Sequence, residues 1–194
     1  MKLEFDDYPK ILERVKQAGF KVFESNDYDL NIIGERNPRG KVNKFDDWIH
    51  VCFTVDGVWQ WYAYKCTTDA GLHYLKQGNT AILVHDQQYR GAYLIGLHRG
   101  QYWALVQRGN TVDVWRDRNK DDVHDYGSNM ERGFFGINIH RASAKGESKI
   151  VDEYSAGCQV IADPDDFAEF MTLCRLQVEN LGYDQFSYTL LMGL

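Results

Sequence analysis

The sequence predicts a mainly β fold with a few helices (α+β), as a single domain of residues 1–194. The length matches one domain, which we divide into an N-terminal extension, residues 1–45, and a core, residues 46–194. The composition, 44% hydrophobic and 26% charged, is typical of globular proteins with a hydrophobic core. Through the middle of the chain, short runs rich in β-branched and aromatic residues alternate with glycine- or asparagine-containing turns, which favours strands.

A short amphipathic helix is expected near the N-terminus, within residues 8–20. Ile11, Leu12, Val15 and Phe20 recur there at roughly helical spacing, with charged residues between them. This helix should pack as a cap on the rest of the domain.

Strands are expected through the centre of the chain. The segments with the strand pattern are residues 30–33, 48–55, 58–66, 80–84, 92–97, 102–107, 111–115 and 134–140. Turn signals at Asp56-Gly57, Arg99-Gly100 and Gly109-Asn110 separate neighbouring segments, as in hairpins.

A second helix is expected over residues 163–176. Asp163 and Pro164 form a capping signal at its start, and Phe167, Phe170 and Cys174 then recur at helical spacing. This helix follows directly after Cys158 and the short segment that carries it.

The charge and hydropathy of the chain exclude several function classes. A net charge of -6 argues against broad binding to nucleic acid or anionic lipid, since both favour a basic face. The chain has no run of about 20 apolar residues, so we expect no membrane span. Residues 1–7 include acidic side chains where a secretory signal has an apolar core, so synthesis in the cytoplasm without a signal peptide is expected.

The cysteines predict separate thiols rather than a structural metal cluster. They form no CxxC pair and no zinc-like spacing with histidine. The four are Cys52, Cys66, Cys158 and Cys174.

The segment from His140 to Cys158 carries the most chemical information. His140 ends a predicted strand, and Gly157 allows a tight turn immediately before the thiol. Because a cysteine attacks as its thiolate and an imidazole is the usual activator, Cys158 is the candidate nucleophile and His140 the candidate base. The backbone N–H groups of Ala156, Gly157 and Cys158 are candidates for binding the oxyanion of an acyl-transfer intermediate.

This segment resembles the catalytic motif of the L,D-transpeptidase (YkuD-type) family, a histidine followed after about 14 to 17 residues by Ser/Thr-His-Gly-Cys. His140, Ser155, Gly157 and Cys158 match in identity and spacing. The resemblance covers roughly residues 50–175. It implies an L,D-transpeptidase-like β-sandwich or barrel catalytic domain with a short N-terminal helical cap, an acyl-enzyme on Cys158, and His140 as general base.

Two residues depart from the family motif. Ala156 stands where the family usually has a second histidine, which resembles a divergent Ser-x-Gly-Cys branch that includes hydrolases of peptidoglycan-linked bonds. Arg141 stands where a small residue commonly follows the first histidine. Its guanidinium is a candidate ligand for a substrate carboxylate, and a solvated surface arginine is the alternative.

The resemblance implies that the chain acts on bacterial peptidoglycan stem peptides. The lack of a signal peptide favours a phage-associated or lysis-released hydrolase over a transpeptidase, acting at the cell wall after lysis or within a phage particle. Two alternatives stay open, a non-catalytic cell-wall-binding or virion structural protein that keeps the fold, and a cysteine hydrolase of an unrelated amide. In the non-functional interpretation, Cys158 is a small buried hydrophobic residue and His140 is a histidine of the core.

A second pattern suggests a calcium ion, although acyl transfer by cysteine requires no cofactor. Asp117, Asn119, Asp121 and Asp125 place oxygen atoms at alternate positions, as in a calcium loop. The central glycine and final glutamate of an EF-hand are missing. The rival interpretation is an acidic, solvated turn.

Overall fold

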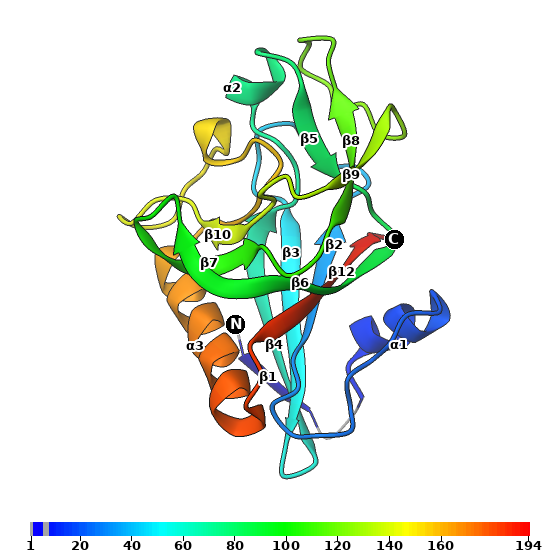
Figure 1. The fold of residues 1–194 in the computed structure, drawn as a ribbon, viewed down its shortest axis with the longest axis vertical. Coiled ribbons are helices and arrows are strands. Elements are labelled where there is room, and N and C mark those ends of the chain that lie inside the picture. Colours follow the sequence, from blue (N-terminus) through cyan, green and yellow to red (C-terminus); the bar gives the residue numbers. More distant parts are fainter. Residues whose placement is uncertain (1, 6–7) are drawn as a thin grey trace.

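Eight strands close into a β-barrel in the computed structural model, which describes residues 2–5 and 8–194 (Figure 1). In order around the barrel they are β4 (Val58–Thr67), β11 (Gln159–Ile161), β10 (Ile139–Arg141), β7 (Tyr102–Gln107), β6 (Gln87–His98), β12 (Gln185–Met192), β2 (Asn31–Arg36) and β3 (Asp47–Val55). Antiparallel pairing of β3 with β4 closes the ring. The predicted mainly β fold with a few helices is therefore confirmed.

The remaining elements surround the barrel. A three-stranded antiparallel sheet at one end, uppermost in Figure 1, consists of β5 (Thr80–Leu83), β8 (Val112–Asp117) and β9 (Met130–Gly133). The other elements are β1 (Lys2–Phe5), which pairs with β4, the helices α1 (Lys10–Gln17), α2 (Leu72–Leu75) and α3 (Pro164–Leu181), and the 3-10 turn η1 (Asp152–Tyr154). Within the described ranges, no helix is long and apolar enough to cross a bilayer.

Two of the predicted turns form short hairpin loops, one of two residues and one of three. Asp56 and Gly57, with φ angles of 50° and 76°, join β3 to β4. Arg99 and Gly100, with φ angles of 49° and 71°, begin the three-residue loop that ends at Gln101 and joins β6 to β7. In the two-residue loop, positive φ at both positions matches the twist of the flanking strands, which explains why Asp-Gly occurs there. In the three-residue loop, Gly100 adopts its positive φ without steric cost.

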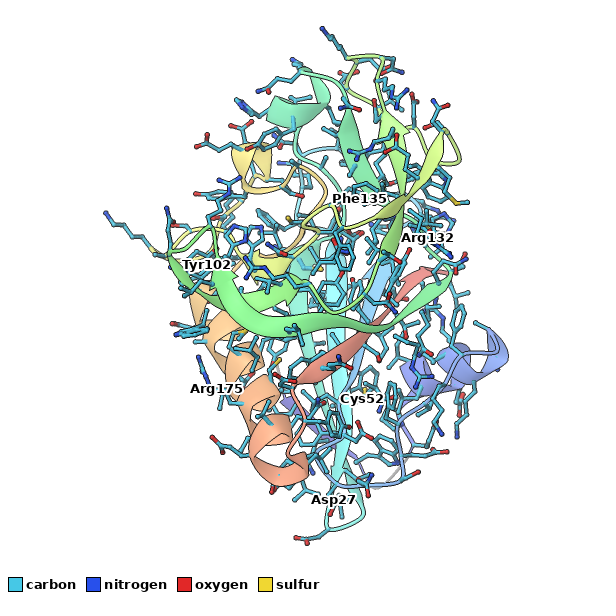
Figure 2. All side chains as sticks on the ribbon, in the orientation of Figure 1. Asp27, Cys52, Tyr102, Arg132, Phe135 and Arg175 are labelled. Atoms are coloured by element: carbon cyan, nitrogen blue, oxygen red, sulfur yellow. The ribbon has the colours of Figure 1, made fainter. Side chains whose placement is uncertain are left out.

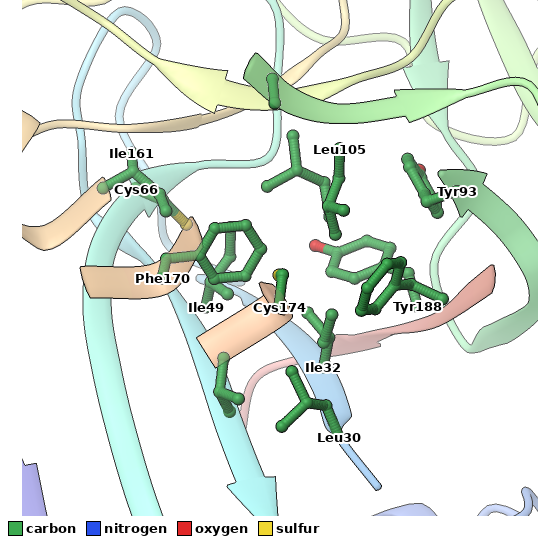
Figure 3. Packing of buried hydrophobic residues seen from close by; sticks show 14 of the residues in the cluster. Leu30, Ile32, Ile49, Cys66, Tyr93, Leu105, Ile161, Phe170, Cys174 and Tyr188 are labelled. Atoms are coloured by element: carbon green, nitrogen blue, oxygen red, sulfur yellow. The ribbon is translucent and has the colours of Figure 1, made fainter. Parts of the chain in front are cut away.

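The main hydrophobic core joins α3 to the barrel strands (Figure 3). Phe170 of α3 packs edge-on against Tyr64 of β4, with ring centroids 6.1 Å apart. The helix begins at Asp163, whose side chain accepts hydrogen bonds from two backbone N–H groups of the first turn, and it ends at Gly182 with a φ of 72°. Both predicted helices are confirmed, α1 as residues 10–17 and α3 as a helix longer than expected.

Only the end of the predicted strand at residues 134–140 forms a strand. The side-chain oxygen of Gln107 accepts hydrogen bonds from the N–H groups of Phe135 and Gly136, both at 2.9 Å. The Gln107 side chain therefore satisfies backbone N–H groups that would otherwise donate to a neighbouring strand. The chain joins the barrel only from Ile139 onward, as β10.

Strands β2 and β12 lie at opposite ends of the chain and pair in parallel inside the barrel. β2 falls within residues 1–45, the range expected to form an extension, yet it lies between β12 and β3. β12 was not among the predicted strands. Its sequence does alternate, since the apolar Phe186, Tyr188 and Leu190 lie between the polar Gln185, Ser187 and Thr189.

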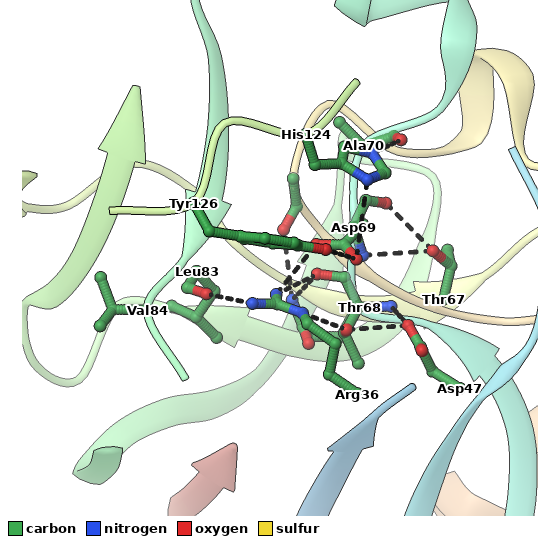
Figure 4. A network of polar contacts seen from close by, with 12 residues as sticks. Arg36, Asp47, Thr67, Thr68, Asp69, Ala70, Leu83, Val84, His124 and Tyr126 are labelled. Carbon is green, nitrogen blue, oxygen red and sulfur yellow. Dashed lines mark hydrogen bonds and ion pairs between the residues drawn. The ribbon is translucent and has the colours of Figure 1, made fainter. Parts of the chain in front are cut away.

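A buried polar network fastens the small sheet to the barrel (Figure 4). Arg36 of β2 is fully buried and donates hydrogen bonds to the Leu83 carbonyl of β5 and to the carbonyl and hydroxyl oxygens of Thr68. Its guanidinium also forms an ion pair of 3.1 Å with Asp69, which accepts a hydrogen bond from the hydroxyl of Tyr126. One side chain thus connects three separate segments of the chain.

Candidate functional site

Cys158 is the one cysteine that lines a pocket among the described residues. Cys52, Cys66 and Cys174 are free and fully buried, whereas Cys158 is partly buried in the wall of a pocket of about 390 Å³. The pocket lies where the small sheet meets the barrel, a junction marked by Phe135 in Figure 2. A thiol in this position can meet a ligand, which the other three cannot.

A second pocket of similar volume, about 410 Å³, lies between Phe23 and Gln177. Neither a cysteine nor a histidine lines it. The pocket at Cys158 is therefore the better candidate for chemistry, because it combines a nucleophile with imidazole and guanidinium groups.

The turn before Cys158 is shaped by Ser155 and Gly157. The Ser155 hydroxyl donates to the Cys158 carbonyl at 2.8 Å and accepts from the Gly157 N–H at 3.1 Å. Gly157 has a φ of 126°, and a Cβ there would lie 2.2 Å from the carbonyl oxygen of Ala81 in β5. Glycine is therefore required both by the backbone conformation and by the close approach of β5.

His140 and Cys158 lie on neighbouring parallel strands. β10 and β11 pair Ile139 with Gln159 and His140 with Val160, so Cys158 lies level with Asn138. Side chains two positions apart share a face of a sheet, which places the imidazole and the thiol on the same face as diagonal neighbours, with Cα atoms on the order of 8 Å apart. The structure thus brings the two predicted residues to one side of one strand pair.

The main-chain carbonyl of Arg141 sets the tautomer of His140. It lies 2.8 Å from Nδ1 of the imidazole and can only accept a hydrogen bond, so Nδ1 carries the proton. Nε2 is then left with a lone pair. This is the arrangement that a general base requires. The Tyr102 hydroxyl lies 3.3 Å from the same Nδ1 and donates to the Arg141 carbonyl at 3.2 Å, so a side chain and a backbone group orient the ring together.

We expect the thiol and the imidazole both to be uncharged at neutral pH. The Cys158 thiol contacts the Gly136 carbonyl at 3.4 Å, and no hydrogen bond between described residues joins it to an imidazole. Burial raises the pKa of Cys158, and the Asn138 N–H and Arg99 only partly offset this. Burial, followed by the neighbouring His98, lowers the pKa of His140 to about 3.

Alkylation of Cys158 should therefore report a neutral thiol. With iodoacetamide, modification should be slow at pH 7 and should rise with a midpoint above about 8.5, the ordinary pKa of cysteine, because burial disfavours the thiolate. Peptide mapping identifies the modified residue. A midpoint below about 7 that disappears in His140→Ala would instead indicate a thiolate–imidazolium pair at rest.

Acid should destabilise the fold through His140. Its pKa in the folded state, about 3, is below the ordinary 6.5, so only the unfolded chain takes up this proton between those values. The stabilisation is fully present above pH 6.5 and is lost as the pH falls toward 3. Between pH 7 and 4.5 the loss should be about 2 to 3 kcal/mol. Urea unfolding at both pH values should show a smaller loss for His140→Gln, and an equal loss would contradict this origin.

Two backbone N–H groups remain for an oxyanion. The Gly157 N–H is bonded to the Ser155 hydroxyl, whereas those of Ala156 and Cys158 have no partner among the described residues. The sequence-based candidate set of three donors therefore reduces to two in this conformation.

Two cations line the pocket, Arg99 and Arg116, and Arg141 is not one of them; Arg116 is paired with Glu131. The guanidinium of Arg141 packs over the ring of Tyr102, 4.3 Å from its centroid, and does not line the pocket. Arg99, at the tip of the β6–β7 hairpin, lines the pocket and forms no ion pair with any described carboxylate. Sequence inspection missed it because a hairpin-loop arginine resembles any solvated charge.

The acidic loop uses its oxygen atoms to hold its own turns. Asp117 accepts from the N–H of Asp125 and Asp121 from that of Val123, while the Asn119 amide donates to Asp125. Across the described residues, no group of three acidic, histidine or cysteine side chains is placed to hold a metal ion. The calcium hypothesis gains no support from this geometry.

Comparison with protein families, curated proteins and solved structures finds no significant match for this chain. The resemblance to the L,D-transpeptidase family therefore rests on the segment from His140 to Cys158 and stays a hypothesis.

Proposed function

We propose that the chain is a cysteine-nucleophile acyl-transfer enzyme that acts on peptidoglycan stem peptides, as a hydrolase in preference to a transpeptidase. The observation that supports this most is that Cys158 lies in a pocket wall and shares one face of the β10–β11 strand pair with His140. The Arg141 carbonyl holds the proton of that imidazole on Nδ1. The choice of peptidoglycan rests on the motif resemblance.

In the proposed acylation step, the Cys158 thiol turns from the Gly136 carbonyl toward Nε2 of His140. Sulfur attacks the carbonyl carbon of the scissile amide while the thiol proton moves to Nε2. The N–H groups of Ala156 and Cys158 stabilise the oxyanion. When the intermediate collapses, the C–N bond breaks and the imidazolium returns its proton to the leaving amine, which leaves a thioester on Cys158.

In the proposed deacylation step, His140 takes a proton from a water molecule as the water attacks the thioester carbonyl. The C–S bond breaks, the imidazolium protonates the departing thiolate, and a carboxylic acid is released. An amine in place of water would give transpeptidation by the same route. His140 must accept and return a proton in each half of the cycle, and its pKa of about 3 makes it a weak base in the resting state.

Arg99 is the proposed ligand for a substrate carboxylate near the scissile bond. Arg99→Gln should lower kcat/KM for stem peptides about 10- to 100-fold, mainly through KM, because a charge-assisted hydrogen bond is lost. Arg141→Gln is the matched control, since that guanidinium packs on Tyr102 outside the pocket. Equal effects of the two substitutions would remove Arg99 from this role.

The function is tested by incubating the protein with purified sacculi. Mass spectrometry of the released fragments should identify stem peptides cut at one amide bond, and intact-protein mass should show a transient adduct on Cys158. His140→Gln should abolish both signals. Addition of a free amine distinguishes the outcomes, since a hydrolase releases carboxylic acids without incorporating the amine.

One observation favours a second candidate, a cell-wall-binding or virion structural protein without turnover. The Cys158 thiol is hydrogen-bonded to the Gly136 carbonyl rather than to an imidazole, and burial raises the pKa of this thiol. Under this alternative the protein sediments with sacculi, releases no fragments and forms no adduct. A cysteine hydrolase of an unrelated amide would form an adduct with small acyl donors but would not sediment with sacculi.

A further inference from the structure

A second imidazole lies in the wall of the Cys158 pocket. His98, the last residue of β6, lines the pocket and stacks on His140 with ring centroids 4.0 Å apart and planes inclined by 24°. His140 itself does not line the pocket. His98 is therefore the imidazole that a ligand in this pocket can contact.

The tautomer of His98 is set by Asn138. The backbone N–H of Gln107 donates to Oδ1 of Asn138 at 2.9 Å, which fixes the orientation of the amide. The amide nitrogen of Asn138 then donates to Nδ1 of His98 at 3.1 Å. Nδ1 is an acceptor, so a neutral His98 carries its proton on Nε2.

The two stacked rings therefore hold opposite tautomers. His140 has a lone pair on Nε2, whereas His98 has an N–H there that no described residue accepts from. Burial and Arg99 lower the pKa of His98, and repulsion between stacked cations opposes protonation of both rings. When His140 takes the thiol proton, His98 stays a neutral donor.

We propose that the Nε2–H of His98 donates a hydrogen bond to the carbonyl oxygen of an acyl group under attack by Cys158, as a side-chain member of the oxyanion hole. This inference rests on the proposed acyl-transfer function, although not on the choice of peptidoglycan as substrate. His98 keeps its proton throughout and makes no bond to carbon. Its donor supplements the N–H groups of Ala156 and Cys158, since that of Gly157 is occupied by Ser155.

The test compares two reactions of Cys158, acylation by p-nitrophenyl acetate and alkylation by iodoacetamide. Only acylation forms an oxyanion. His98→Phe, which keeps a ring to stack on His140, should slow acylation about 100-fold and alter alkylation less than about threefold. His98→Gln, which places an amide N–H near the position of Nε2, should restore most of the acylation rate.

Several outcomes overturn the inference. The inference fails if His98→Phe slows both reactions equally or does not slow acylation. It also fails if His98→Gln does not restore acylation, or if wild-type Cys158 is not acylated at all. If the phenylalanine variant does not fold, ¹⁵N NMR of the wild-type imidazoles decides, because a proton on Nδ1 of His98 excludes the proposed donor. If acylation of Cys158 depends on His98 as expected but the wild-type protein does not cut sacculi, the proposed substrate is refuted and the inference stands.

Discussion

Replacing Cys158 with alanine should reduce the cleavage of purified sacculi about a thousandfold or more. The thiol is the only nucleophile in the proposed cycle, and removing the nucleophile of a covalent mechanism leaves only the catalysis that comes from binding. The rate of fragment release, followed by mass spectrometry, measures the effect. Unchanged cleavage would refute the proposed function.

Cys174→Ala is the matched control for this experiment. Cys174 lies buried in the core on α3 and lines no part of the pocket. Its removal creates a small cavity and should lower stability by about 1 to 2 kcal/mol without lowering the rate per folded molecule. Comparing the two variants separates loss of the thiol at the site from loss of a thiol elsewhere.

Replacing Arg36 with methionine should cost about 3 to 5 kcal/mol of stability. The substitution would leave the carboxylate of Asp69 poorly compensated and the carbonyls of Thr68 and Leu83 without their donor in a buried environment. The midpoint of urea unfolding, with the free energy extrapolated to water, measures the loss. A loss below about 1 kcal/mol would show that the network is not required for the fold.

A second substitution tests whether the buried charge causes this loss. Combining Arg36→Met with Asp69→Asn removes the ion pair and should recover part of the stability, because only the Asp47 carboxylate then lacks the compensation that Arg36 supplied. Additive losses in the double variant would instead assign the effect to the hydrogen bonds of Arg36. Both variants keep the residues that line the Cys158 pocket.

Local patterns predicted much of the fold. The hairpin loops at Asp56-Gly57 and Arg99-Gly100 were predictable because glycine adopts positive φ without steric cost, and α3 because Asp163 caps its first turn. β12 was not predicted, although Phe186, Tyr188 and Leu190 alternate with polar residues. Most of the segment before His140 does not form a strand, because Gln107, distant in sequence, binds its backbone.

The site was predictable only in part. Spacing and residue type identified His140, Ser155, Gly157 and Cys158 as a candidate constellation, and the pairing of β10 with β11 places them on one strand pair and its adjoining turn. His98, Asn138 and Arg99 were not identified, since no short motif connects them to the thiol. They reach the pocket because the β6–β7 hairpin and the irregular segment before β10 meet there.

By itself the sequence determined the mainly β character of this protein, its two longest helices, several turns and a candidate Cys–His pair. Each of these features is encoded by residues that lie close together in the sequence. The tertiary structure alone decided that the strands close into a barrel and that Cys158 is the one described thiol in a pocket wall. It also decided which nitrogen of His140 and of His98 carries the proton. Protonation states and pocket walls depend on burial and on partners from distant segments, which a local pattern does not encode.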